Sequence, residues 1–284
     1  MQKSVLNSPR LLKIKKEKHK ILYKKILFLT LFLATIFIGL AFLSRWGEFN
    51  ISNIEITGNK VIETEAIKNI VKDKTFGYYF YFFPKSNFLL YPKGEIINEL
   101  TLRFKRLKNI SLNTSNSKTL NVSLVERTAL YTYCGEQLEE KMDTNTKETN
   151  SNDEKCYFMD ESGYVFDEAP YFSGEVYLKF YGKTNIPYFT KLISFKNTLE
   201  KIGVKPAIFN ILDNGDIEIY LSSSLKSQMG PKIIFKADSD FEQVLENLQS
   251  VLTTEPLQTD FKNKYSSLLY IDLRFGNKVY YKFK

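Results

Sequence analysis

The strongest constraint on this chain is an uncharged apolar run near its N-terminus, "ILFLTLFLATIFIGLAFL", from Ile26 to Leu43. Its eighteen residues would form about 27 Å of helix, close to the roughly 30 Å hydrocarbon thickness of a bilayer. A cleaved signal peptide and a buried core helix are the alternatives. The 25 residues before the run and the lack of an A-x-A pattern disfavour the first, and the unbroken apolarity disfavours the second. We therefore predict a transmembrane helix over residues 26–44 that contacts the lipid bilayer.

The positive charge of the chain is concentrated before this run. Of the 40 Lys/Arg and 32 Asp/Glu residues, ten basic residues and one acid, Glu17, lie within residues 1–45. Nine of these ten precede the run, and Trp46 follows it as an interfacial aromatic. We therefore predict a protein of the cell membrane, with a cytoplasmic basic arm over residues 1–25 and with everything after Trp46 outside the membrane. The remainder carries 30 basic and 31 acidic residues, so nucleic acid is not an expected partner.

The two cysteines fall on the predicted outer side, where disulfides persist. Cys134 ends the strand-like stretch "LYTYC", and Cys156 begins the strand-like stretch "CYFMD". Residues 135–155 between them form a polar insertion without aromatic residues. The sequence predicts a hairpin clamped at its base by a Cys134–Cys156 bridge, worth about 3 kcal/mol by loop closure. Two free, half-buried thiols are the alternative. A metal site is not expected, because the single histidine, His19, lies in the cytoplasmic arm.

The first outer segment predicts the order strand, helix, helix, strand, strand. Gly58-Asn59 is a turn, and Thr64 is predicted to cap the first helix, which carries Ile67, Ile70 and Val71 on one side. The aromatic stretch of residues 77–92 is predicted to wrap the domain without a regular element and to pack against it. The other predicted elements are a strand over 51–57, a helix over 93–102 and strands over 109–113 and 119–126.

The second outer segment combines amphipathic helices with short strands. A helix is predicted over residues 188–202, and a Ser239/Glu242 capping box opens another. Strands over 208–212 and 217–221 flank a turn at 213–216, which lacks the spacing and the final Glu of a calcium loop. The predicted fold class is α+β, with a largely antiparallel sheet and helices over one face.

The chain ends in "YIDLRFGNKVYYKFK", which predicts a hairpin with a two-residue Gly276-Asn277 turn. The last strand would place Val279, Tyr281 and Phe283 on one face. It would place Lys278, Tyr280, Lys282 and Lys284 on the other. No later strand follows to pair with it. Edge lysines often only protect a strand from aggregation; the alternative is that a segment of another protein adds beside this strand.

Several motifs together resemble the FtsQ/DivIB family of bacterial division proteins. They are "IEITGNKVIETEAI", "TLNVSLVERTALYTY" with its Glu126-Arg127 pair, "CYFMDESGYVF", "NGDIEIYL" and "YIDLRFGNKVYYKF". They cover nearly all of residues 51–283 in the family's order, behind a basic arm and a single anchor. The resemblance implies a POTRA-type β-α-α-β-β domain over 49–127 and a C-terminal β domain over 128–284.

The same resemblance implies a non-enzymatic scaffold of the division septum. Its C-terminal strands would take up a strand of an FtsB-like protein, itself paired with an FtsL-like protein, and other membrane-embedded division proteins would contact the POTRA-type domain. By position, partner binding falls on Arg274, Phe275, Val279, Tyr280, Tyr281, Lys282 and Phe283. Lys278 and Lys282 would suit an acidic partner segment.

Enzymatic alternatives lack the necessary residues. With no histidine on the outer side, no His-based triad or zinc site is expected there, and no P-loop or G-x-S-x-G motif occurs. Glycosidic chemistry needs a pair of carboxylates, and the nearest candidates are Asp160, Asp167 and Glu168, but they lie around a predicted turn. We expect no catalytic residue and no cofactor. Two other functions remain open: a POTRA-bearing factor for polypeptide transport or assembly, and a cell-wall binder using residues 78–83.

Overall fold

The computed structural model describes residues 9–138, 155–183, 186–223 and 229–284. The chain divides into two compact units, Met1–Glu126 and Arg127–Lys284, one residue before the boundary drawn from the sequence. Most of the polar insertion of residues 135–155 lies outside the described residues.

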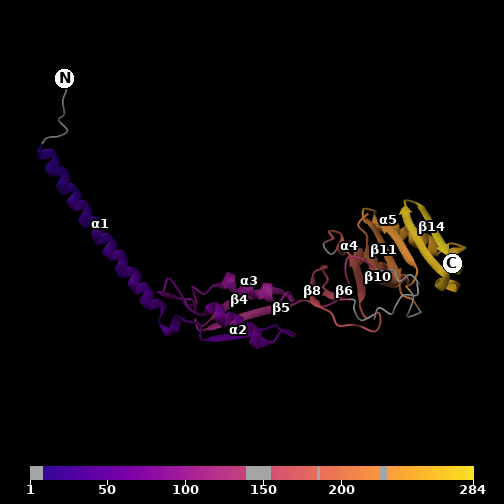
Figure 1. Cartoon of the computed structure of the whole chain (residues 1–284), viewed down its shortest axis with the longest axis horizontal. Coiled ribbons are helices and arrows are strands. Elements are labelled where there is room, and N and C mark those ends of the chain that lie inside the picture. The colour runs from indigo at the N-terminus through magenta and orange to yellow at the C-terminus, as the bar shows by residue number, and fades with distance from the viewer. Residues whose placement is uncertain (1–8, 139–154, 184–185, 224–228) are drawn as a thin grey trace, which may run out of the picture. The chain divides into compact units, whose positions relative to one another are not determined.

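The N-terminal helix α1, Pro9–Ser44, contains the apolar run (Figure 1). By length and composition it is the one described helix able to cross a membrane. The helix begins at Pro9, so it continues into the predicted basic arm of residues 1–25, whose cytoplasmic position stays a prediction. The arm is rich in Lys and Leu, which have good helix propensity, so it extends the helix at little cost.

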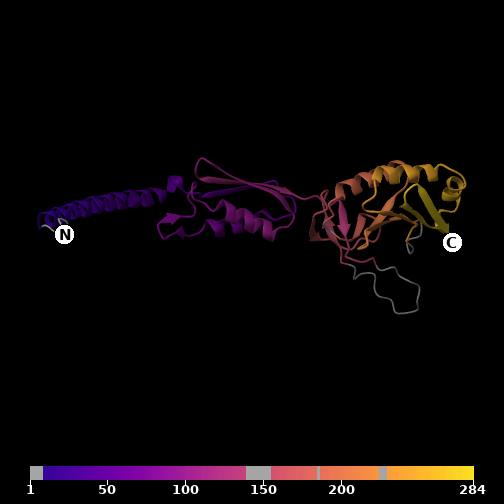
Figure 2. The same ribbon diagram turned by 90° about the horizontal axis from the view of Figure 1, so that it is seen from above.

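A three-stranded sheet and two helices form the rest of the first unit. The strands are β1 (Asn53–Thr57), β4 (Leu107–Ser115) and β5 (Thr119–Glu126), in the order β1-β5-β4, with β1 parallel and β4 antiparallel to β5. Helices α2 (Thr64–Thr75) and α3 (Lys93–Arg103) cover one side of this sheet (Figure 2). Their apolar stripes supply the buried residues Ile67, Ile70, Val71, Ile96 and Leu100. A 3₁₀ turn, η2 (Gly47–Phe49), follows α1.

Two predicted helix caps are each off by one residue. Helix α2 has Glu63 at its N-cap, and the Thr64 hydroxyl instead accepts a hydrogen bond from Asn59 Nδ2 at 3.0 Å. Helix α5 (Phe241–Leu252) is capped by Asp240 rather than Ser239, and the Asp240 carboxylate accepts from the Glu242 N–H at 3.0 Å. Serine and aspartate cap helices about equally well, so the sequence alone does not choose between Ser239 and Asp240 for helix α5.

The aromatic stretch between α2 and α3 departs from its prediction. It contains a short antiparallel hairpin, β2 (Tyr78–Tyr79) and β3 (Phe83–Pro84), where no regular element was expected. The predicted packing is also wrong for much of it, because the following side chains are exposed: Tyr78, Phe80, Tyr81 and Phe82.

The second unit is built on one nine-stranded sheet, in the order β14-β13-β12-β11-β10-β9-β6-β7-β8. Most neighbouring strands are antiparallel, but β12–β13, β9–β10 and β6–β9 are parallel. The strands are β6 (Tyr131–Tyr133), β7 (Tyr157–Met159), β8 (Val165–Glu168), β9 (Leu178–Gly182), β10 (Pro206–Ile211), β11 (Asp216–Leu221), β12 (Lys232–Lys236), β13 (Leu268–Phe275) and β14 (Lys278–Phe283).

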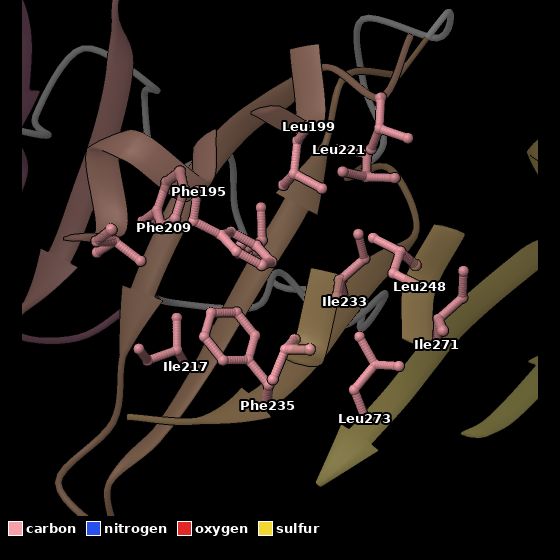
Figure 3. Packing of buried hydrophobic residues seen from close by; sticks show 14 of the residues in the cluster. Phe195, Leu199, Phe209, Ile217, Leu221, Ile233, Phe235, Leu248, Ile271 and Leu273 are labelled. Carbon is pink, nitrogen blue, oxygen red and sulfur yellow. The ribbon is translucent and has the colours of Figure 1, made fainter. Parts of the chain in front are cut away.

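Helices α4 (Phe189–Lys201) and α5 lie together on one side of this sheet, in orange in Figure 2. A short helix, α6 (Leu257–Asn263), and a 3₁₀ turn, η3 (Tyr265–Ser267), lead into β13. Figure 3 shows the core between helices and sheet, where Phe195 of α4 meets Phe235 of β12 with ring centroids 5.0 Å apart. The protein is thus mixed α/β, with a long apolar N-terminal helix and a large, mostly antiparallel sheet.

Candidate partner-binding edge

Strand β14 lies at one edge of the nine-stranded sheet. It pairs antiparallel with β13, and among the strands the structure describes it has no neighbour on its other side. The turn before it uses Gly276 at φ 65°, a left-handed conformation that glycine adopts without the clash of a Cβ. Asn247 of α5 donates its Nδ2 to the Gly276 carbonyl at 2.9 Å, so the turn is held against the helix layer. The backbone groups along the outer side of β14 are therefore positioned for another strand.

The side chains of β14 divide between the core and the solvent. Val279 and Phe283 pack against the hydrophobic core. Tyr281, predicted on the same face, is 38% exposed, and Tyr280 on the opposite face is 49% exposed. Tyr280 meets the exposed ring of Phe275 edge to face at 5.3 Å. The edge thus presents aromatic side chains next to its available backbone.

Lysines accompany these aromatics. Lys278 and Lys282 are both exposed on β14, with Lys278 opposite Phe275 and Lys282 opposite Tyr270 of β13. A cationic, aromatic edge of this kind is chemically suited to an extended segment that carries carboxylates.

Arg274, another predicted site residue, makes ion pairs within its own unit. Its guanidinium pairs with both oxygens of Asp272, with Nε 2.9 Å from Oδ1 and Nη2 2.6 Å from Oδ2, and its Nη1 lies 2.7 Å from Asp216 Oδ2. Asp216 begins β11, two strands away in the sheet. Burial raises the pKa of Asp272, but the hydrogen bonds from Arg274 outweigh it and hold the pKa below its ordinary value. These contacts of Arg274 join β13 to β11 within the unit.

Cys134 and Cys156 form a disulfide, with their Cα atoms 4.1 Å apart. They directly follow β6 and precede β7, which pair as an antiparallel hairpin. The bridge closes the base of the segment that contains the polar insertion. In the order of the sheet it lies at the opposite end from β14.

The Glu126-Arg127 pair organises the chain on both sides of the boundary between the units. The Glu126 carboxylate accepts the backbone N–H groups of Lys60, Val61 and Ile62 at 2.8 to 3.1 Å. Burial raises the pKa of Glu126, but these three bonds, with the nearby positive charge of Arg106, lower it below its ordinary value. This carboxylate therefore fixes the loop that begins α2. The sequence shows the pair as a motif but does not reveal this role, because the partners lie more than sixty residues away.

Arg127 pairs with Asp160, whose carboxylate is fully buried. Asp160 also accepts from the Ser162 N–H, the Ser162 hydroxyl and the Tyr164 N–H. Burial raises its pKa, but these hydrogen bonds together lower it. Asp160 thus holds the predicted turn of residues 160–163. Asp167 and Glu168 lie on β8, and within the described ranges no group of three His, Cys, Asp or Glu residues is arranged to hold a metal ion.

No protein-family model matches this chain, and no curated protein matches it.

Proposed function

We propose that this chain is a non-enzymatic scaffold of the FtsQ/DivIB type, which recruits partners at the bacterial division septum. In this proposal α1 crosses the cell membrane with the basic arm in the cytoplasm, and both units lie outside. An extended segment of an FtsB-like protein, itself bound to an FtsL-like protein, adds as a further strand beside β14.

One observation carries the proposal. Strand β14 ends a nine-stranded sheet, has no neighbouring strand on its outer side among the described residues, and exposes Tyr280 and Tyr281. In strand addition, main-chain hydrogen bonds supply affinity and side-chain contacts supply specificity. Exposed tyrosines supply large contact area at a small cost in side-chain entropy.

The first unit supports the family assignment. Its element order β1-α2-α3-β4-β5 is the order that the resemblance implies for a POTRA-type domain, apart from the added β2-β3 hairpin. Through this domain the proposed scaffold contacts other membrane-embedded division proteins.

The test co-expresses the full chain with the FtsB-like and FtsL-like proteins of the same cell and measures how much of each co-purifies in detergent. Tyr280→Ala removes an exposed contact ring, and Lys282→Glu reverses the charge of the edge, so we expect both to reduce the recovery of the FtsB-like protein. The matched controls are Tyr171→Ala, another exposed tyrosine of the second unit, and Lys236→Glu, another exposed lysine. Equal recovery with all four variants would rule out β14 as the recruitment site.

A further inference from the structure

Apolar surface gathers on the aromatic hairpin, which we define as residues 77–85. Phe80 is 84% exposed and Tyr81 is 90% exposed, and Phe82 beside them is 47% exposed. Three neighbouring aromatic rings in water at the tip of one hairpin mark an interaction surface. Neither the core of the first unit nor the proposed partner edge uses them.

The hairpin lies against α1, inside the apolar run of that helix. The Phe37 ring meets Phe82 and Phe83 edge to face, with centroids 5.4 Å apart in each pair. Phe37 precedes the last helical residue, Ser44, by seven positions, which is about 10 Å along the helix axis. The eighteen-residue run barely matches the hydrocarbon thickness of a bilayer, so it cannot slide far along the membrane normal. When α1 spans, Phe37 lies in the outer part of the apolar layer, on the side of Trp46, so Phe82 and Phe83, which contact it, bring the hairpin to this boundary of the bilayer.

Three backbone groups at the hairpin tip have hydrogen-bond partners within the chain. Arg45, just after α1, donates from Nη2 to the Tyr81 carbonyl at 2.8 Å and from Nε to the Phe82 carbonyl at 3.1 Å. The Phe82 N–H donates to the Tyr79 carbonyl at 3.0 Å. An irregular segment near lipid needs such partners, because no water is there to replace them. Arg45 therefore satisfies two carbonyl groups of this turn and lowers the cost of placing it at a membrane surface.

The conformation of the tip also favours a role for the rings themselves. Phe80 has φ 48° and Tyr81 has φ 65°, the left-handed region that glycine and asparagine adopt most easily. Aromatic residues there cost folding energy that a glycine would avoid. The exposed rings return nothing to the core in exchange, so their value must come from a contact outside the chain.

A polar network fixes the hairpin to the end of α1. The buried Asn87 and the nearby Asn50 each donate from Nδ2 to the Ser44 carbonyl at 3.1 Å, and the Ser86 hydroxyl donates to Asn50 Oδ1 at 2.9 Å. The hairpin thus keeps its level relative to the helix.

We propose that the aromatic hairpin is a second membrane contact of this protein, with Phe80, Tyr81 and Phe82 seated at the headgroup–acyl boundary of the leaflet next to Trp46. Aromatic rings are favourable at this depth, where one side of the ring is apolar and the other is hydrated. The contact orients the first unit on the bilayer beside its anchor. The inference rests on α1 crossing the membrane and does not depend on a role in division.

The test uses Trp46, the single tryptophan of the chain. The full-length variant Trp46→Phe/Phe80→Trp is reconstituted into phosphatidylethanolamine–phosphatidylglycerol vesicles whose lipids carry bromine near the headgroup end of their acyl chains. Tyr81→Trp in the same background gives a second probe if the first variant misfolds by circular dichroism. Val61→Trp is the matched control, since Val61 is 64% exposed in the same unit but lies beyond the end of β1 that is remote from α1.

We expect the hairpin tryptophan to lose most of its emission to the brominated lipid and to shift to shorter wavelength, while the control stays bright. Equal emission of hairpin and control probes would overturn the proposal. It would also be overturned if purified cell-wall glycan shielded the hairpin tryptophan from aqueous iodide while brominated lipid left it bright, because the hairpin would then be a glycan-binding site. Loss of FtsB-like recruitment alone leaves these readouts unchanged, so the two proposals fail separately.

Discussion

The replacement Arg274→Met tests whether Arg274 is an internal clamp or a direct partner contact. Methionine keeps the aliphatic stem but removes the guanidinium, which leaves Asp272 and Asp216, 6% and 8% exposed, without their shared cation. Removing one partner of a buried ion pair costs about 3–5 kcal/mol. Because the Arg274 side chain is itself 31% exposed, solvent screens part of this, and we expect a loss of about 2 kcal/mol.

This loss should show as faster local opening of β13 and β14. Hydrogen–deuterium exchange of the full chain in detergent, resolved to peptides over residues 268–283, measures it directly. A loss of about 2 kcal/mol corresponds to roughly thirty-fold faster exchange at pH 7, after division by the intrinsic rates. Lys282→Met, which removes an exposed cation from β14, is the control and should change exchange little.

The pH dependence follows from the lowered pKa of Asp272. A carboxylate with a depressed pKa contributes stability above its unfolded pKa of about 3.9, and that contribution is lost as the pH falls through the folded pKa. In the variant Asp272 keeps the hydrogen bond from the residue 274 N–H but loses the side-chain bonds and the positive charge that lower its pKa, so the difference between the two proteins should shrink as the pH falls toward and below about pH 4. Unchanged protection of β13 and β14 in Arg274→Met, combined with lost partner recovery, would refute the clamp and assign Arg274 to the partner instead.

Three further predictions concern stability, each measured by urea unfolding followed by circular dichroism. Gly58→Ala should destabilise the first unit much more than Gly77→Ala. Both glycines have a left-handed φ, which costs an alanine about 1–2 kcal/mol, but a Cβ at Gly58 would lie 2.0 Å from the Leu124 carbonyl oxygen, whereas one at Gly77 has no neighbour within 4 Å. Equal losses of stability in the two variants would contradict this. Phe235→Ala should cost about 3–5 kcal/mol, whereas the 55% exposed Phe275→Ala should cost about 1 kcal/mol at most. Reduction of the disulfide, which spans 22 residues, should cost about 3 kcal/mol, and an unchanged midpoint in reductant would exclude a structural role.

Sequence periodicity predicted the elements that have one polar and one buried face. Leu192, Phe195 and Leu199 at helical spacing predicted α4, and the alternation around Gly276-Asn277 predicted the last hairpin. Strand β12 was missed because its "IIF" segment is buried on both faces, so it shows no alternation. The parallel pairings were also missed, because they join strands far apart in the chain.

The site was predictable only where it depends on local pattern. The exposed aromatics and lysines of β14 follow from alternation, but the partner of Arg274 across the sheet, Asp216, is 58 residues away and no spacing rule connects them. The aromatic hairpin was predicted to pack because aromatic residues are usually buried. The structure instead exposes Phe80 and Tyr81, and no periodicity in the sequence indicates this.

The lysines of β14 bear on both interpretations of this edge, protection against aggregation and recruitment of a partner. If two copies of the chain paired through β14, Lys278 and Lys282 of each would approach the same charges on the other, and like charges across a strand pair are destabilising. The same lysines would attract an acidic segment, so one set of side chains disfavours self-pairing and favours the proposed partner. The two interpretations therefore predict one combined result. Charge reversal at Lys282 should weaken partner recovery and, in the same preparation, increase self-association on size-exclusion chromatography, whereas pure protection would increase self-association alone.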